Sequence, residues 1–233
     1  MQKPTVFFGD KNYATKPVTK PGALSIIDEP FAMLSAMHGF NNLIFPYQVH
    51  GIAGLVVESG NFNTIRSFVQ DADWIITNVP KVGIGVLTAD CVPLLIYDPV
   101  HNAVGAVHAG WRGAVEGVVV AAIDGMRSAF GSRAEDVQVF IGPHARTCCY
   151  QVDQQMYDTV MQKRYGKSAW RQNDQALFFD LYGCCVEQLK EVGVLQNNIT
   201  DTGMCTICNT AYCSYRREKA ESQRNISLIG LIY

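Results

Sequence analysis

The chain has 233 residues, of which 48% are hydrophobic and 17% are charged, and this balance excludes intrinsic disorder as its main state. Its 19 basic and 21 acidic residues give a formal net charge of −2, so nucleic acid is not expected as the principal partner. The N-terminal residues lack a signal-peptide core, and no aliphatic stretch reaches the length of a membrane span, so we expect a cytoplasmic protein without a membrane partner.

Short apolar runs bounded by turn residues predict β-strands at residues 82–87, 92–97, 103–108, 137–141 and 226–233. A Pro- and Gly-rich segment at 16–22 is expected to be a surface loop that precedes them. Because turn residues such as Asp98-Pro99 separate closely spaced runs, we expect the first three strands to be adjacent and antiparallel, with a buried face.

Helical periodicity predicts three helices. The clearest follows Gly113, where apolar residues recur with the spacing of one helical face: Val115, Val118, Val119, Ala122, Ile123 and Met126. Two more are expected near 154–164 and 181–191, the second begun by Asp180 as N-cap and ended by Gly193. With no internal repeat or linker, the pattern indicates a single domain over residues 1–233 of mixed α/β (α+β) class, with mixed β-sheets flanked by helices.

The densest polar signal in apolar surroundings comprises Cys91, at the end of Thr88-Ala89-Asp90-Cys91, and His108, at the end of a predicted strand. A tight turn between strands could bring these two side chains together, and His50 is a third soft ligand. Two His and one Cys would form a three-ligand zinc site with one open position, as in catalytic zinc. Since Cys and His near strand ends are often packed core residues, spacing alone leaves both interpretations open.

Five stretches occur in the order seen in the YfiH-like family: Gln48-Val49-His50-Gly51, Thr88-Ala89-Asp90-Cys91-Val92-Pro93, Gly105-Ala106-Val107-His108-Ala109-Gly110-Trp111-Arg112-Gly113, Ile141-Gly142-Pro143 and Ser214-Tyr215-Arg216-Arg217. Over residues 49–233 the chain resembles this family, which is also called laccase-domain proteins, polyphenol-oxidase-like proteins, or purine nucleoside phosphorylases of the multicopper-oxidoreductase type. The resemblance implies a YfiH-like fold, similar to that of a toxin deamidase.

The resemblance also implies a cofactor and an activity. In the family a zinc ion is held by residues that correspond to His50, Cys91 and His108. The family's activities are phosphorolysis of purine nucleosides such as adenosine, inosine and methylthioadenosine, and deamination of adenosine. A nucleoside and phosphate are therefore the expected partners, and the chain could be a monomer or a homodimer.

Candidate roles follow for further residues. Zinc with an open position could activate water for attack at C6 of adenine, whereas phosphorolysis needs cations that bind phosphate, for which Arg112, Arg216 and Arg217 are the candidates. Each of them could instead be an ordinary solvated or ion-paired arginine. Asp90 could orient His108, act as a base or cap a turn, and Trp111 could stack on a base, wall the pocket or pack in the core.

The chain departs from the family pattern in two places. Many members carry an Arg, a Gly-Gly pair and a Ser upstream of the first zinc ligand, where this chain has Ala36-Met37-His38-Gly39-Phe40-Asn41-Asn42. We therefore expect residues 1–45 to be a divergent N-terminal part. Gln151 stands where the family usually has Glu, which removes a carboxylate.

The other seven of the eight cysteines need a separate interpretation. Cys205, Cys208 and Cys213 resemble a metal knuckle, but a second pair at zinc-finger spacing is missing. Two vicinal pairs, 148–149 and 184–185, complete the set. Because buried thiols are common, we expect all seven to be small core hydrophobes. His38, His101 and His144 are likewise expected to be loop or core histidines.

Alternative functions stay open. A copper polyphenol oxidoreductase would bind Cu²⁺, but multicopper laccases need about ten His ligands and this chain has five histidines. A cysteine hydrolase would use Cys91 as nucleophile and His108 as its base. Editing of peptidoglycan precursors would need a larger pocket, and a metal-storing or partner-binding protein would not need an open coordination position.

Overall fold

The computed structural model describes residues 3–22, 29–167, 169–173 and 176–233, and the strands among them form three sheets. A four-stranded sheet has the order β1 (Thr5–Phe8), β13 (Asn225–Gly230), β5 (Val82–Thr88) and β2 (Asn42–Ile44). A six-stranded sheet has the order β12 (Ile199–Asp201), β8 (Gln138–Ile141), β6 (Val92–Asp98), β7 (Ala103–Ala109), β4 (Trp74–Thr77) and β3 (Gly54–Val57). A small sheet has the order β10 (Trp170–Asn173), β11 (Ala176–Phe179) and β9 (Gln151–Val152).

The helices are α1 (Phe31–His38), α2 (Trp111–Glu116), α3 (Val118–Phe130), α4 (Gln154–Met161), α5 (Leu181–Val192) and α6 (Tyr215–Glu218). Short 3₁₀ turns are η1 (Lys11–Tyr13), η2 (Gln196–Asn198) and η3 (Lys219–Glu221). In the part of the chain that the structure describes, no helix combines the length and the apolar character needed to cross a membrane.

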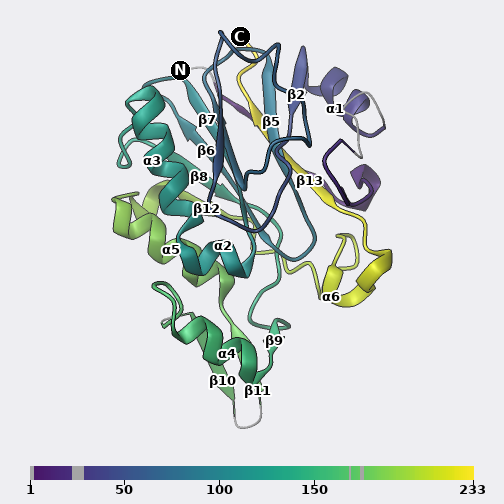
Figure 1. Cartoon of the computed structure of the whole chain (residues 1–233), viewed down its shortest axis with the longest axis vertical. Helices are drawn as coiled ribbons and strands as arrows, with labels where there is room; N and C mark the ends of the chain where they lie inside the picture. Colours follow the sequence, from purple (N-terminus) through teal and green to yellow (C-terminus); the bar gives the residue numbers. More distant parts are fainter. Residues whose placement is uncertain (1–2, 23–28, 168, 174–175) are drawn as a thin grey trace.

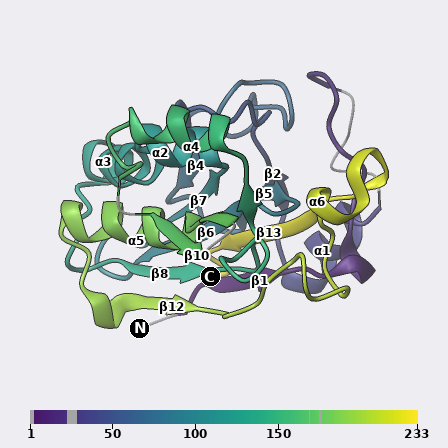
Figure 2. The same cartoon turned by 90° about the horizontal axis from the view of Figure 1, so that it is seen from below.

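Three layers of apolar contact hold these elements together. One cluster lies between the six-stranded sheet and α2, α3 and α5, and a second lies between the two larger sheets. A third lies between the four-stranded sheet and α1. Both views place α3 and α5 on one side of the molecule and α1 and α6 on the other (Figures 1 and 2). The mixed α/β fold with helices flanking mixed sheets is therefore confirmed.

The central strands are buried on both faces. On β6, Leu94 and Ile96 pack toward the helices, whereas Leu95 and Tyr97 pack toward the other sheet. Side chains of a strand alternate between its two faces, so a strand sandwiched between two apolar layers becomes a continuous apolar run. This arrangement explains why these strands were recognisable as short apolar stretches in the sequence.

The prediction that the first three strands are adjacent is wrong for one of them. β6 and β7 pair antiparallel over their full length, as expected, but β5 lies in the four-stranded sheet between β13 and β2. The chain changes sheet in the turn between β5 and β6, where Asp90 has a φ of 86°. A strand that is apolar on both faces contains no signal that tells which sheet it joins.

The helices agree with their predicted faces but not with all predicted lengths. Gly117, with a φ of 100°, divides the first predicted helix into α2 and α3. The apolar face predicted for that helix is buried along both parts. Asp180 caps α5 by accepting from the N–H of Gly183, and Gly193 ends it in the left-handed conformation, both as predicted. The helix expected at 154–164 ends at Met161, and the last strand ends at Gly230.

Candidate active site

The three sequence-predicted ligands converge at one end of the six-stranded sheet. Cys91 immediately precedes β6, and the antiparallel register places Pro93 opposite His108 on β7. His50 arrives from the loop between β2 and β3. The ligand atoms of His50, Cys91 and His108 all lie within 4.8 Å of one another, and the Nε2 of His50 is 3.9 Å from the Sγ of Cys91.

A buried carboxylate, Asp73, organises this group. One of its oxygens accepts a hydrogen bond from the Nδ1 of His108 at 2.7 Å and from the backbone N–H of His50 at 3.0 Å. The other accepts from the N–H of Gly51 at 2.6 Å and of Val49 at 3.2 Å. Because an ionised carboxylate only accepts, the Nδ1 of His108 carries a proton, so Nε2 is the ring nitrogen that could act as a ligand.

The loop that carries His50 is fixed from its other side by Gln48. The amide of Gln48 donates to the carbonyl of Leu87 and accepts from the N–H of the same residue, both at 2.8 Å. His50 itself has a φ of 63°, a conformation that costs free energy in a non-glycine residue and persists only where the surroundings impose it. The hydrogen bonds of Asp73 and Gln48 supply that constraint.

Close packing explains the first glycine after His108. A Cβ on Gly110 would lie 2.6 Å from the Cδ2 of His50 and 3.2 Å from the Sγ of Cys91. Any larger residue would therefore displace two of the three converging side chains. The local sequence thus keeps the ligand group compact.

The charges of the group fit a thiolate beside a cationic partner. Burial alone would raise the pKa of Cys91, but the charge and hydrogen bond of His108 and the hydrogen bond of His50 lower it to about 6. Burial would lower the pKa of His108, but Cys91 and Asp73 raise it to about 9. A preformed thiolate and two imidazoles suit a transition metal such as zinc or copper rather than magnesium or calcium, so this group could hold such an ion.

A cavity of about 960 Å³ opens beside the group. Four cationic side chains line it, namely Arg112, Arg216, Lys219 and Arg224, together with two carboxylates and several aromatic rings. The carboxylates are already engaged: Asp153 accepts from the N–H of Met156, and Asp90 accepts from two donors described below. The cavity therefore favours an anionic or polar ligand with an aromatic part.

The contacts of Asp90 are those of a residue that caps a turn, and its predicted role as a base stays a prediction. Its carboxylate accepts from the hydroxyl of Thr206 at 2.7 Å and from the backbone N–H of Arg216 at 2.6 Å, so it ties three segments together at the cavity wall. The residue that orients His108 is Asp73, which sequence reasoning missed. Its only local signal is an acidic residue at the start of the apolar run 74–77.

The predicted arginines occupy different places. The guanidinium of Arg112 lies 4.3 Å from the ring centroid of Trp111, and both residues line the cavity. Arg216 also lines it, donating to the carbonyl of Gln151 at 2.6 Å and lying 5.2 Å from the ring of Tyr150. Arg217 instead donates to the carbonyls of Thr206, Ile207 and Tyr212 and to Glu218, and it is not among the described residues that line the cavity.

The remaining cysteines and histidines separate into two sets. Cys184, Cys185 and Cys213 are buried, as expected for small core hydrophobes. The same prediction is wrong for Cys148 and Cys208, which are exposed, because their thiols converge with two others instead of packing in the core. The histidines predicted to be loop or core residues are such: His38 packs against Phe7, His101 pairs with Asp98, and His144 is buried.

The protein is a mixed α/β domain with a small-molecule pocket and a group able to hold a metal. That group consists of two imidazoles and a thiolate, and it borders the cationic cavity. The chain belongs to the family described as multi-copper polyphenol oxidoreductase laccase, whose model matches residues 24–232. The resemblance to the YfiH-like family is thereby confirmed.

Relatives and solved structures agree with this family. The chain is 36% identical over 180 residues to a purine nucleoside phosphorylase of Clostridium acetobutylicum, covering 72% of this chain and 70% of that protein. It is 34% identical over 161 residues to a purine nucleoside phosphorylase of Aquifex aeolicus, covering 69% of this chain and 72% of that protein. The structure of YfiH from Bacillus licheniformis superimposes with a TM-score of 0.82 at 25% identity, covering 98% of this chain and 92% of that chain. The structure of YlmD from Geobacillus stearothermophilus superimposes with a TM-score of 0.78 at 24% identity, covering 99% of this chain and 91% of that chain, and it has the same fold.

Proposed function

We propose that the protein is a zinc-dependent purine nucleoside phosphorylase that acts on adenosine, inosine or methylthioadenosine, with adenosine deamination as a second activity. The observation that carries this proposal is the meeting of a His50–Cys91–His108 ligand group with a cationic cavity. The names of the relatives from Clostridium and Aquifex support the same activity.

The cavity offers separate contacts for the two halves of the substrate. Its volume of about 960 Å³ leaves room for a nucleoside together with phosphate. The rings of Trp111 and Tyr150 provide flat apolar surfaces on which a purine could stack. Arg112 and Arg216 provide fixed positive charge for phosphate.

In phosphorolysis an oxygen of phosphate forms a bond to C1′ of the ribose while the bond from C1′ to N9 of the purine breaks. The electron pair of that bond stays on the purine, which takes up a proton, and ribose 1-phosphate is the second product. The arginines would bind and orient the attacking phosphate. Burial raises the pKa of Tyr150, so its phenol stays protonated and could donate a hydrogen bond to the departing base.

The zinc would be held by the Nε2 of His108, the thiolate of Cys91 and the ring of His50. When bound, it supplies a Lewis acid that polarises an oxygen or nitrogen atom in the cavity. Asp73 would keep His108 in the ligating tautomer. Deamination would use the same cavity with water in place of phosphate, and it would convert adenosine to inosine and ammonia.

A second candidate is a cysteine hydrolase, because the low pKa of Cys91 and the adjacent His108 also suit a thiolate nucleophile. A thiolate that ligates zinc is not free to attack a substrate, so metal content separates the two functions.

The test combines elemental analysis of the purified chain with adenosine turnover in the presence and absence of phosphate. Zinc in the protein and phosphate-dependent release of adenine would support the phosphorylase, while inosine formed without phosphate would support the deaminase. Cys91→Ala, purified identically, must lose both activities, which excludes a contaminating host enzyme. A metal-free chain with a readily alkylated Cys91 and no nucleoside turnover would overturn the proposal in favour of the hydrolase.

A further inference from the structure

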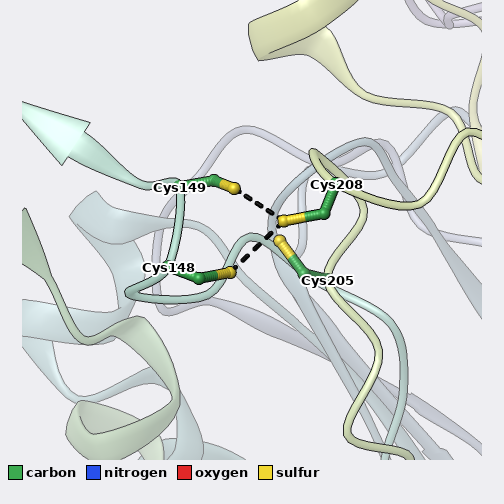
Figure 3. A group of neighbouring side chains, drawn as sticks. All are labelled: Cys148, Cys149, Cys205 and Cys208. Atoms are coloured by element: carbon green, nitrogen blue, oxygen red, sulfur yellow. Dashed lines mark hydrogen bonds between the residues drawn. The ribbon is translucent and has the colours of Figure 1, made fainter.

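A second group of converging ligands lies next to the cavity wall, and none of its members is among the described residues that line the cavity. It consists of Cys148 and Cys149, in the turn between β8 and β9, and of Cys205 and Cys208, in the loop after β12. Figure 3 shows the four thiols pointing toward one another from these two loops. All four sulfur atoms lie within 4.8 Å of one another, and all four cysteines are free thiols.

The sulfurs are close enough together to share one small cation. Zinc binds thiolates at about 2.3 Å in a tetrahedron, which places neighbouring sulfurs about 3.8 Å apart. The Sγ of Cys208 lies 3.4 Å from that of Cys148 and 2.7 Å from that of Cys149. Small rotations of the side chains would therefore bring all four thiolates onto a single ion.

The four cysteines differ in exposure: Cys205 is buried, Cys149 is half-buried, and Cys148 and Cys208 are exposed. Cysteine binds a metal as its thiolate. Four neighbouring thiolates would repel one another without a cation between them.

The two loops are held in register independently of the thiols. The N–H of His144 donates to the carbonyl of Met204, and that of Thr206 donates to the carbonyl of His144. Arg146 forms an ion pair with Asp201 at 2.8 Å. The cysteines are therefore brought together by the fold itself.

We propose that Cys148, Cys149, Cys205 and Cys208 bind a second zinc ion in a closed tetrathiolate site. With four protein ligands the ion has no open position, so its role is structural. It would join the loop that leads to Tyr150 and Gln151 to the loop that contains Thr206, the partner of Asp90, and so it would brace one wall of the cavity. The site does not depend on which reaction the cavity catalyses.

The main alternative to a bound metal at these four cysteines is a disulfide bond. A bond between Cys208 and either Cys148 or Cys149 would need an oxidant and would leave two thiols unpaired. It would also lower the mass of the intact protein by two hydrogen atoms. Mass spectrometry of the native chain therefore distinguishes a disulfide from a metal site.

The experiment measures zinc per chain in the full-length protein purified under reducing conditions without chelator. We expect two zinc ions in the unaltered chain and one in Cys205→Ser and in Cys208→Ser. Cys91→Ala should also contain one, held by the other group of ligands. Cys213→Ala, which changes a buried cysteine outside both groups, serves as the matched control and should keep two.

A second measurement covers the case in which a variant fails to fold. Cobalt added to metal-free Cys91→Ala should give the intense sulfur-to-cobalt charge-transfer absorption of a tetrathiolate site, with one equivalent at saturation. One zinc in the unaltered chain that survives in Cys208→Ser would overturn the proposal. So would a native disulfide among the four cysteines, or absence of the cobalt spectrum.

Discussion

The two cysteine-containing groups differ in their ligands, in their surroundings and in the way the fold assembles them. The His50–Cys91–His108 group mixes nitrogen with sulfur, is oriented by a buried carboxylate and borders a cavity. The four-cysteine group contains sulfur only and lies on two loops, and none of its members is among the described residues that line the cavity. Three ligands leave a metal one position for a substrate, whereas four close it.

The two groups are also positioned with different rigidity. Cys91 and His108 are set by the register of two central strands that are buried on both faces. Cys148 and Cys208 are exposed and rest on turns. Changes to the first group should therefore abolish chemistry without unfolding the protein, whereas changes to the second should act first on local stability.

The largest expected effect is on turnover after loss of a ligand. Cys91→Ala and His108→Ala should each lower phosphate-dependent release of adenine by roughly 10³-fold, because a Lewis acid contributes several kcal/mol to the transition state. Metal at the four cysteines should remain, and circular dichroism should show an intact fold. Either variant with its full metal content would contradict the ligand assignment, and Cys213→Ala is the control.

Asp73 allows a smaller change at the same group. Asp73→Asn keeps the size of the side chain but presents an amide donor where the carboxylate accepts from His108 and three backbone N–H groups. We expect the affinity for metal at this group to fall by about 10- to 100-fold. Competition with a chelator measures it. Asp71→Asn, at an exposed neighbouring position, should leave the affinity unchanged, and an equal loss there would refute the role of Asp73.

Alkylation of the metal-free, reduced chain compares the two groups directly. His108 lowers the pKa of Cys91 to about 6, whereas desolvation and the neighbouring Cys208 raise the pKa of Cys148 to about 11. At pH 7 Cys91 is mostly thiolate and Cys148 mostly thiol, so Cys91 should react roughly 10 to 100 times faster. Its rate should fall as the pH is lowered through 6, while the rate of Cys148 rises up to about 11.

Peptide mass spectrometry after timed labelling assigns each rate. The denatured chain is the control, because unfolding removes both environments and the two thiols should then react alike. A Cys91 that titrates near pH 9 in the folded chain would show that the pair with His108 does not form.

Features that depend on residues close together in the sequence were predicted better than contacts between distant residues. The apolar helical face over 115–126 was predicted correctly, because helical periodicity is a local property of the sequence. The break at Gly117 was not predicted, because it depends on a left-handed backbone conformation that residues other than glycine also adopt in this chain. Cys91 and His108 were predictable as a pair because one short turn connects their strands. Asp73, directly before β4, lies beside His108 on the neighbouring antiparallel strand, but the two are 35 residues apart in the sequence and the periodicity of neither strand indicates the pairing.

The four-cysteine group shows the same limit. Spacing rules expect two Cys-x2-Cys pairs, but here Cys205 and Cys208 meet a vicinal pair about 60 residues earlier in the chain. Two neighbouring cysteines in a turn suggest nothing about metal until the loops are seen side by side. The spacing of Cys205 and Cys208 indicated half of the group, but all four cysteines were expected to be core thiols.

The smallest expected effect concerns Arg216, which lines the cavity through its side chain while its backbone N–H donates to Asp90. Arg216→Ala preserves that backbone contact and removes only the guanidinium. If the guanidinium binds phosphate, the KM for phosphate should rise roughly 10-fold, as expected for one charge-assisted hydrogen bond, while deamination changes less than about twofold. Arg127→Ala, on the exposed surface of α3, is the matched control. Equal losses in both reactions would mean that Arg216 supports the wall through the carbonyl of Gln151 and does not select phosphate.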